Sequence, residues 1–153
     1  MAERRRDAFE AALGALRRRE QTSAEIASWL TKRGFGEDEV EAAISSLIEA
    51  GELDDERFAR RYAEDKRELR GWGAERIREA LASKGLAPAL IEQVLADDDR
   101  GAQLERAATL LAKRGRALAG ESDRARALGF LTRRGYDYEV AYEAVRLAAR
   151  QAA

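Results

Sequence analysis

One short pattern of apolar residues around a glycine occurs three times in this chain, and it constrains the fold more than any other feature. The glycines are Gly34, Gly85 and Gly135, spaced 51 and 50 residues apart. The matched apolar positions around them are Leu30, Phe35, Val40, Ala43 and Ile44, then Leu81, Leu86, Ile91, Val94 and Leu95, then Leu131, Tyr136, Val140, Ala144 and Val145. Such self-similarity predicts a repeat protein whose copies stack on their neighbours and present a long surface to a partner.

Apolar residues inside each copy recur every three or four positions, which predicts amphipathic helices and no sheet. The first copy has three such stripes, at residues 9–16, 26–30 and 40–48. The other two copies follow the same plan. The predicted fold is therefore all-α and elongated, a curved array of three tandem three-helix repeats. The repeats are predicted at residues 1–51, 52–99 and 100–153.

Short polar side chains mark the starts of several predicted helices, because their oxygen atoms accept hydrogen bonds from the first free backbone amides. The predicted N-caps are Thr22 or Ser23, Asp54 and Ser122. Leu53 and Phe58 flank Asp54 with the spacing of a hydrophobic staple. The segment Gly71-Trp72-Gly73 is predicted to end the helix that Asp54 begins, and the run Asp97-Asp98-Asp99 is interpreted as an acidic joint before the third copy.

The composition removes most catalytic chemistry. The chain contains no Cys and no His, so thiol nucleophiles, imidazole bases and the usual zinc ligands are missing. Carboxylates of Asp54, Asp55 and Glu56 could bind a cation, but helix capping explains them without one. We expect no enzymatic activity, no metal and no cofactor. Because no segment is long and apolar enough to span a membrane and the N-terminus lacks a signal-peptide pattern, we expect a cytoplasmic protein that binds no membrane.

Charge is distributed unevenly although the net charge is only −1. Residues 37–65 carry three basic and eleven acidic side chains, whereas residues 100–153 carry eleven basic and six acidic ones. This asymmetry favours directional docking on a partner with its own charge pattern. Solvated helix faces would explain any single cluster equally well.

Basic residues around aromatic rings in the second copy are the best candidates for partner or DNA binding. Cations and rings in this combination can contact backbone phosphates and stacked bases. Phe58 and Tyr62 have the spacing of core residues, whereas Trp72 lies between two glycines. The predicted binding residues are Arg57, Arg61, Arg70, Trp72 and Arg76 in the second copy, with Arg124 and Arg133 in the third.

Two local motifs and the repeat plan resemble the RecX family of bacterial recombination regulators. The motifs are Leu53-Asp54-Asp55-Glu56-Arg57-Phe58-Ala59 and Arg70-Gly71-Trp72-Gly73, the latter leading to Ile77. The resemblance covers nearly the whole chain. It implies a monomer of tandem three-helix repeats that binds the groove of the RecA recombinase filament. It further implies inhibition of recombinase, ATPase and coprotease activities in DNA repair, recombination and the SOS response, with weak binding to single-stranded or duplex DNA.

Two other interpretations remain open at this stage. A helix pair joined by a glycine turn is also how helix-turn-helix modules are built, so each copy could place its third helix in a DNA groove without any recombinase partner. The first of these helices begins with Glu37, Asp38 and Glu39, which phosphates would repel. A scaffold without a charged partner is the third interpretation, and it needs no separation of acidic and basic segments.

Overall fold

A computed structural model describes residues 2–152, and within that range it contains nine α-helices and no strand. The first repeat consists of α1 (Ala2–Arg18), α2 (Ser23–Lys32) and α3 (Glu37–Glu49). The second consists of α4 (Asp55–Arg70), α5 (Ala74–Ser83) and α6 (Pro88–Leu95). The third consists of α7 (Arg100–Arg114), α8 (Glu121–Arg133) and α9 (Tyr138–Ala152). The predicted all-α fold is confirmed.

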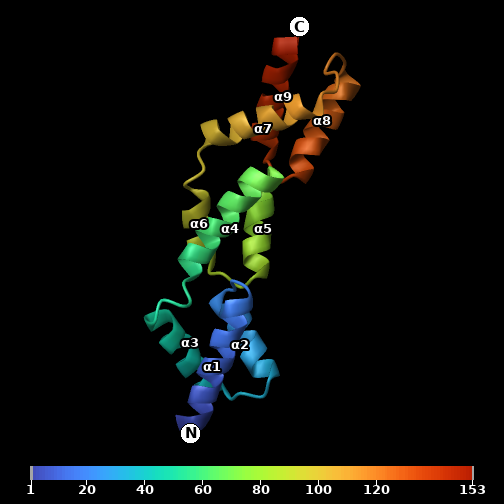
Figure 1. Ribbon diagram of the computed structural model, residues 1–153. Helices are drawn as coiled ribbons and strands as arrows, with labels where there is room; N and C mark the ends of the chain where they lie inside the picture. The colour runs from blue at the N-terminus through green and yellow to red at the C-terminus, as the bar shows by residue number, and fades with distance from the viewer. Residues whose placement is uncertain (1, 153) are drawn as a thin grey trace.

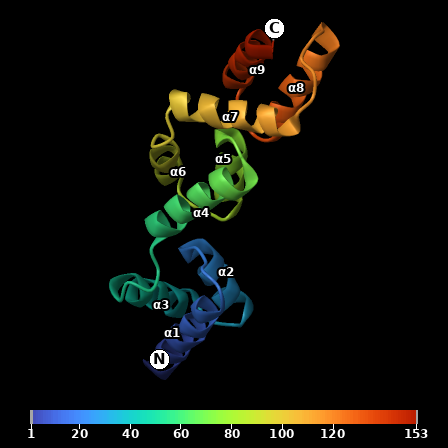
Figure 2. The same cartoon turned by 45° about the horizontal axis from the view of Figure 1, so that its top comes forward.

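The three repeats follow one another in an elongated, curved array, with the two ends of the chain at opposite ends of the molecule (Figure 1, Figure 2). Buried apolar residues form three separate clusters, one in each repeat. The accessible surface is 9391 Å², whereas a compact globular protein of this mass exposes about 7,700 Å². The array therefore keeps roughly one fifth more surface in contact with solvent than a globule would.

The first helix of each repeat buries alanines, alone in α1 and together with a larger side chain in α4 and α7. In α1 the fully buried residues are Ala8, Ala12 and Ala15. The predicted stripe of Phe9, Ala12, Leu13 and Leu16 faces the core of the first repeat, with Ala12 buried and the three larger side chains half-buried against it. Alanine allows two helix backbones to approach closely, and α1 packs mainly against α3. The most buried positions of α4 and α7 include Ala59, Ala63 and Ala107.

Two of the three predicted helix caps are confirmed. The Thr22 side chain accepts a hydrogen bond from the amide of Glu25, whose carboxylate accepts one from the Thr22 amide, so α2 begins with a capping box. Asp54 caps α4 by accepting from the amide of Arg57. The cap predicted at Ser122 is wrong. The N-cap of α8 is Gly120, two residues earlier, and it makes no side-chain cap hydrogen bond; glycine is also common at N-caps.

The residues around Asp54 connect two repeats. Leu53 packs into the core of the first repeat and Phe58 into that of the second, so the predicted staple does not account for the burial of Leu53. The Asp55 carboxylate accepts a hydrogen bond from the amide of Ser23, with 2.9 Å between Oδ1 and N. Asp55 thus satisfies a free amide at the start of α2, in the neighbouring repeat.

Both junctions between repeats place an N-cap residue of one second helix against the carbonyl at the end of another, through a side-chain hydroxyl at the first and a backbone amide at the second. At the first junction the Thr22 hydroxyl, at the start of α2, donates to the carbonyl of Lys84, at the end of α5, over 2.7 Å. At the second junction the Gly73 amide, at the start of α5, donates to the carbonyl of Arg134, at the end of α8, over 2.8 Å. Thr22 and Gly73 are both N-cap residues, and Lys84 and Arg134 both precede a repeat glycine. Helices α2, α5 and α8 therefore stack end to start along one edge of the array.

The repeat glycines allow these helix ends to meet. Gly34, Gly85 and Gly135 have φ values of +94°, +80° and +100°, which confirms the predicted left-handed turns. A Cβ on Gly85 would lie 2.5 Å from the Cβ of Ala24, and one on Gly135 would lie 2.6 Å from the backbone nitrogen of Arg76. A Cβ on Gly34 would meet nothing within 4 Å. Gly85 and Gly135 therefore serve both the turn and the junction, whereas Gly34 serves only the turn.

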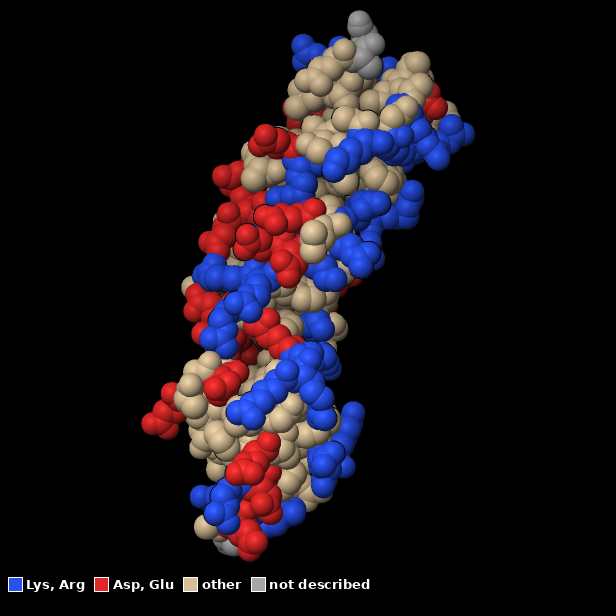
Figure 3. Space-filling model, viewed as in Figure 1, with Lys and Arg blue, Asp and Glu red and all other residues tan. Residues whose placement is uncertain are grey.

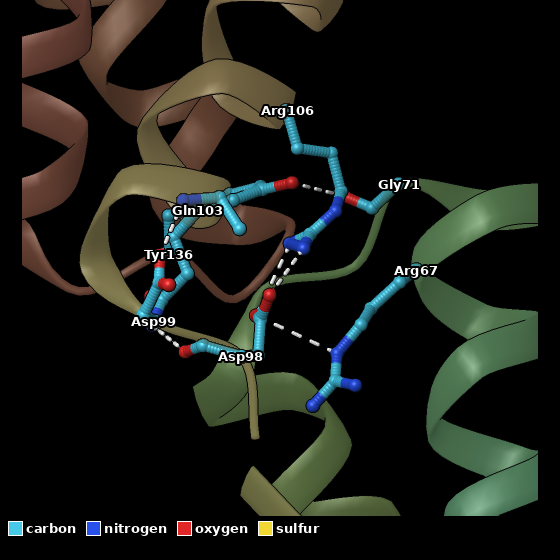
Figure 4. A network of polar contacts seen from close by, with 8 residues as sticks. Arg67, Gly71, Asp98, Asp99, Gln103, Arg106 and Tyr136 are labelled. Atoms are coloured by element: carbon cyan, nitrogen blue, oxygen red, sulfur yellow. Dashed lines mark hydrogen bonds and ion pairs between the residues drawn. The ribbon is translucent and has the colours of Figure 1, made fainter. Parts of the chain in front are cut away.

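A buried carboxylate fastens the third repeat to the second. The side chain of Asp98 is only 4% exposed, and its oxygens lie 2.6 and 3.2 Å from guanidinium nitrogens of Arg106 and 3.5 Å from Nε of Arg67 (Figure 4). A buried charge is stable only when paired in this way, and burial lowers the pKa of Arg67. The interpretation of this segment as an acidic joint is thus incomplete, since Asp98 is structural and Asp99 is the N-cap of α7.

Tyr136, directly after the third repeat glycine, also crosses the second junction. Its hydroxyl donates to the carbonyl of Gly71 over 3.0 Å, and the side chain is almost fully buried. Burial raises the pKa of the Tyr136 hydroxyl to about 12. The neutral, donating form is therefore the one that the fold stabilises.

The double role of two glycines predicts unequal effects of the same substitution. Gly34→Ala should lower the free energy of unfolding by about 1–2 kcal/mol, which is the penalty for the left-handed conformation. Gly135→Ala adds a clash with the backbone of α5 and should cost about 1–3 kcal/mol more. Urea denaturation of the two variants measures this difference. Equal losses of free energy of unfolding in both variants would contradict the close contact between Gly135 and α5.

The Tyr136 hydrogen bond predicts a pH-dependent effect. Tyr136→Phe should destabilise the protein by about 1–3 kcal/mol at pH 8, because the buried Gly71 carbonyl loses its donor. The hydroxyl ionises near pH 10 in the unfolded chain and near 12 in the fold, so the stability of the wild-type protein falls between those values relative to the variant. The difference in free energy of unfolding between the wild-type protein and Tyr136→Phe should therefore narrow from about pH 10 to 12. Tyr142→Phe, at a half-exposed tyrosine, is the control, and a gap independent of pH would refute the assignment.

Candidate partner-binding surface

Positive charge follows the edge formed by the second helix of each repeat. Figure 3 shows Lys and Arg side chains along the side of the molecule where Figure 1 places α2, α5 and α8, and acidic side chains gathered over α4 and its neighbours. We call this side the basic edge. We define its cations as those at or directly after the ends of these helices, together with Arg76 in the first turn of α5: Lys32, Arg33, Arg76, Lys84, Arg133 and Arg134. Because the helices stack end to start, cations that are distant in sequence form one continuous stripe.

The residue before each repeat glycine is a cation, and each of these cations lies over an aromatic ring. Arg33 lies 4.7 Å from the ring centre of Trp29, Lys84 lies 5.4 Å from that of Tyr62, and Arg134 lies 4.9 Å from that of Phe130. These three cations were not among the predicted binding residues. Their identical place before the glycine in every copy was the signal that could have identified them.

Trp72 occupies the centre of the basic edge. It lies in the turn between α4 and α5, half-buried against the core of the second repeat. Arg76 lies 4.4 Å and Lys66 4.9 Å from its ring centre, and Tyr62 meets it edge to face at 6.4 Å. Two cations against one ring hold it in place while keeping positive charge at the surface. Trp72 is thus both a packing residue and part of the exposed face.

The structure brings together four of the predicted binding residues. Arg70 ends α4, Trp72 follows in the turn, and Arg76 lies in the first turn of α5. The end of α8 reaches the same place, since Arg134 donates to the carbonyl of Arg70 over 2.8 Å, and Arg133 is its exposed neighbour in sequence. Arg70, Trp72, Arg76 and Arg133 therefore lie around the second junction.

The other three predicted residues lie elsewhere. Arg57 and Arg61 are near the start of α4, about 14–20 Å along the helix from Arg70 at ~1.5 Å per residue. Arg57 donates to the carbonyl of Gly51, and Arg61 pairs with Glu20 over 3.5 Å. Arg124 is separated from Arg133 by nine residues, about two and a half helical turns, and so faces the opposite side of α8.

Some cations near Trp72 in the sequence are neutralised by carboxylates. Arg60 is paired with Glu56 and Asp97. Arg78 is paired with Glu92 and Glu75, and hydrogen bonds to these carboxylates raise its pKa. These pairs lower the positive charge that α4 and α5 offer away from the basic edge.

The acidic residues that could have formed a metal site have other partners. The Asp54 carboxylate caps α4 and that of Asp55 accepts from the Ser23 amide. Within residues 2–152, no group of three or more carboxylates is arranged to hold a metal ion. Among the described helices, none combines the length and apolar character needed to cross a membrane.

Comparison with known proteins identifies the first two repeats. The family model described as the first three-helix domain of RecX matches residues 8–47, and that of the second three-helix domain matches residues 54–95. A regulatory protein RecX of Thermus thermophilus is 36% identical over 142 residues, covering 93% of this chain and 92% of the relative. A regulatory protein RecX of Trichlorobacter lovleyi is 35% identical over 135 residues, covering 85% and 88%.

Solved structures agree in fold. The crystal structure of RecX from Lactobacillus salivarius superimposes with a TM-score of 0.88 at 20% identity, covering 97% of this chain and 98% of that one. A second crystal structure, of a regulatory protein RecX, superimposes with a TM-score of 0.80 at 23% identity, covering 95% and 72%. At these identities the likeness concerns the fold, including the array of three repeats.

Proposed function

The chain belongs to the RecX family of regulatory proteins, and on that premise we propose that it regulates the RecA recombinase by binding along the RecA nucleoprotein filament. In this proposal the protein acts by binding alone. It restrains the recombinase, ATPase and coprotease activities of the filament, and thereby DNA repair, recombination and the SOS response in the cytoplasm.

The observation that carries this proposal is the basic edge. A filament on DNA is a repeating, charged surface, and a repeat protein with cations at a regular spacing matches such a partner over several of its subunits. With a net charge of only −1, the chain attracts an acidic surface only through a local positive face. The acidic segment at residues 37–65 then faces solvent or a basic part of the filament.

The proposed contact residues are those that the sequence predicted. Arg70, Trp72, Arg76 and Arg133 form the centre of the contact, around the second junction. Arg57, Arg61 and Arg124 are its outlying members. Weak contact with single-stranded or duplex DNA would use the same cations, because phosphates attract any exposed positive side chain. We propose that the protein acts as a monomer at low concentration, with functional units close to residues 1–51, 52–99 and 100–153.

Charge reversal at the centre of the basic edge tests the proposal. Arg70→Glu combined with Arg76→Glu should weaken inhibition of the single-strand-dependent RecA ATPase at least tenfold, about 1.4 kcal/mol. Both side chains are exposed. The double variant loses the contact of Arg76 with Trp72, so the melting temperature should fall only slightly. Inhibition by the wild-type protein should also weaken as salt is raised.

The matched control reverses two other exposed cations. Arg116→Glu with Arg150→Glu changes the net charge equally at two exposed cations outside the proposed contact residues, and it should leave inhibition within about twofold of the wild-type value. Unchanged inhibition by the Arg70 and Arg76 variant would remove these residues from the contact. Loss of duplex binding with inhibition intact would favour the helix-turn-helix interpretation.

A further inference from the structure

We propose that the two ends of the array bind each other between copies, so that protein chains associate head to tail through a third junction like the two internal ones. The internal junctions join the start of one second helix to the end of the next. Within the part of one chain that the structure describes, the start of α8 and the end of α2 make no such junction. Figure 1 places these two helix ends at opposite ends of the molecule.

Equivalent positions identify the residues that would meet. At the first junction Lys84 and Gly85 at the end of α5 meet Thr22 at the start of α2. One repeat earlier, Arg33 and Gly34 end α2 in the same way, with the same left-handed glycine. At the far end, Gly120 is the N-cap of α8, as Thr22 is of α2. The end of α2 in one chain therefore matches the start of α8 in another.

Space and exposure at both ends allow this contact. Gly34 is exposed, and a Cβ placed on it would meet nothing within 4 Å, whereas one on Gly85 or Gly135 would strike the neighbouring repeat. Gly120, at the other end, is exposed and also has nothing within 4 Å of a Cβ. Inside the array, Gly85 and Gly135 let a neighbouring repeat approach closely. At the two ends, the corresponding space next to Gly34 and Gly120 is empty in the described chain.

The positions at the two ends that correspond to the ion pair of the first junction carry opposite charges. At the first junction Lys84 pairs with Glu25 over 3.8 Å. Their equivalents at the ends are Arg33, which precedes Gly34, and Asp123, which lies three residues after the N-cap as Glu25 does. Asp123 has only an exposed pair with Arg126 at 3.4 Å within its own helix, which leaves it able to meet a second cation. Head-to-tail contact would form the junction ion pair again between chains.

A second pair follows from the position of α4 in the first junction. There Asp55 accepts a hydrogen bond from Ser23. Helices α1 and α4 align at a spacing of 51 residues, with Ala8 and Ala59 both fully buried, so Arg4 takes the place of Asp55. Glu121, the residue after the N-cap of α8, takes the place of Ser23.

Arg4 is held at the end of the array where this second pair requires it. Its guanidinium donates to the carbonyl of Gly34 over 3.1 Å and lies 3.4 Å from a carboxylate oxygen of Glu39. Arg4 and Glu121 have opposite charges and are both exposed. The surface around Gly34 therefore offers two cations, Arg33 and Arg4, beside the carboxylate of Glu39, and the start of α8 offers two carboxylates.

The contact joins two different surfaces and therefore extends into an open chain instead of closing as a symmetric dimer. A junction of a few hydrogen bonds and two exposed ion pairs is weak in dilute solution, which is consistent with a monomer there. Any partner that aligns several copies end to end would raise their effective concentration and strengthen the contact. The inference itself rests on the internal junctions and holds whatever that partner is.

Sedimentation velocity of the purified chain over a wide concentration range tests the inference. The wild-type protein should show a sedimentation coefficient that rises with concentration, and less so in high salt. Asp123→Arg alone and Arg33→Asp alone should each weaken association at least about tenfold. An equimolar mixture of the two variants should regain it, because the cation introduced at position 123 of one chain then meets the carboxylate introduced at position 33 of the other.

The controls reverse charges at helix ends outside the proposed contact. Glu139→Arg, in the first turn of α9, matches the Asp123 change, and Lys113→Asp, in the last turn of α7, matches the Arg33 change. Neither should alter association. Circular dichroism and melting temperature establish that each variant folds. Recovery in the mixture cannot arise from misfolding, so it separates a true contact from a structural defect.

Crosslinking gives a second, independent measurement. The chain contains no cysteine, so a chain with Arg33→Cys and a chain with Ser122→Cys can be joined only at the engineered sites by a short bismaleimide. The pair should crosslink rapidly at high concentration, whereas a pair carrying Ser46→Cys and Ala82→Cys, both exposed away from the proposed contact, should not. Sedimentation independent of concentration, together with equal crosslinking of both pairs, would overturn the inference.

Discussion

The structure depends most on the hydrogen bond between the end of one second helix and the start of another. It joins Thr22 to the Lys84 carbonyl and Gly73 to the Arg134 carbonyl. A repeat of about 50 residues buries only a small core and is marginally stable on its own, so the junctions add to the stability of each repeat. The contact also places the partially negative end of α5 against the partially positive start of α2, so the helix dipoles are aligned.

This stacking determines where charge lies on the molecule. Each second helix ends with a cation followed by a glycine, and Arg33, Lys84 and Arg134 each lie over an aromatic ring of their own repeat. Cations are favourable at helix C-termini because they face the negative end of the dipole. When the helices stack along one edge, this local preference becomes a long basic stripe. The cations that end the second helices therefore also form the basic edge, which we propose binds the filament.

Much of the fold could be predicted because its signals are local. The repeat glycines and the caps at Thr22 and Asp54 depend on a few neighbouring residues, and the structure confirms them. Of the buried alanines of α1, Ala12 was predicted, whereas Ala8 and Ala15 were missed, since alanine contributes little to a hydrophobic pattern. Asp98 was interpreted as part of an acidic joint because a run of aspartates usually faces solvent.

The candidate site could be predicted only in part, because only some of its residues are neighbours in the sequence. Arg70, Trp72 and Arg76 were predicted together because one turn connects them in the sequence. Arg134 reaches that place only through the fold, where its guanidinium donates to the Arg70 carbonyl. Arg57 and Arg124 look equivalent to these residues in composition, but helix length and helical phase place them elsewhere.

The sequence by itself determined the number of repeats, the helices in each and the turns between them, because helical periodicity, caps and left-handed glycines act over a few residues. Only the tertiary structure decided how the repeats meet. The bond from Gly73 to Arg134 joins two backbone groups, and the pairing of Asp55 with Ser23 joins residues 32 positions apart. A hydrogen bond between two backbone groups cannot be recognised from the identity of the residues. The partner of a carboxylate depends on which free amide the packing brings close to it.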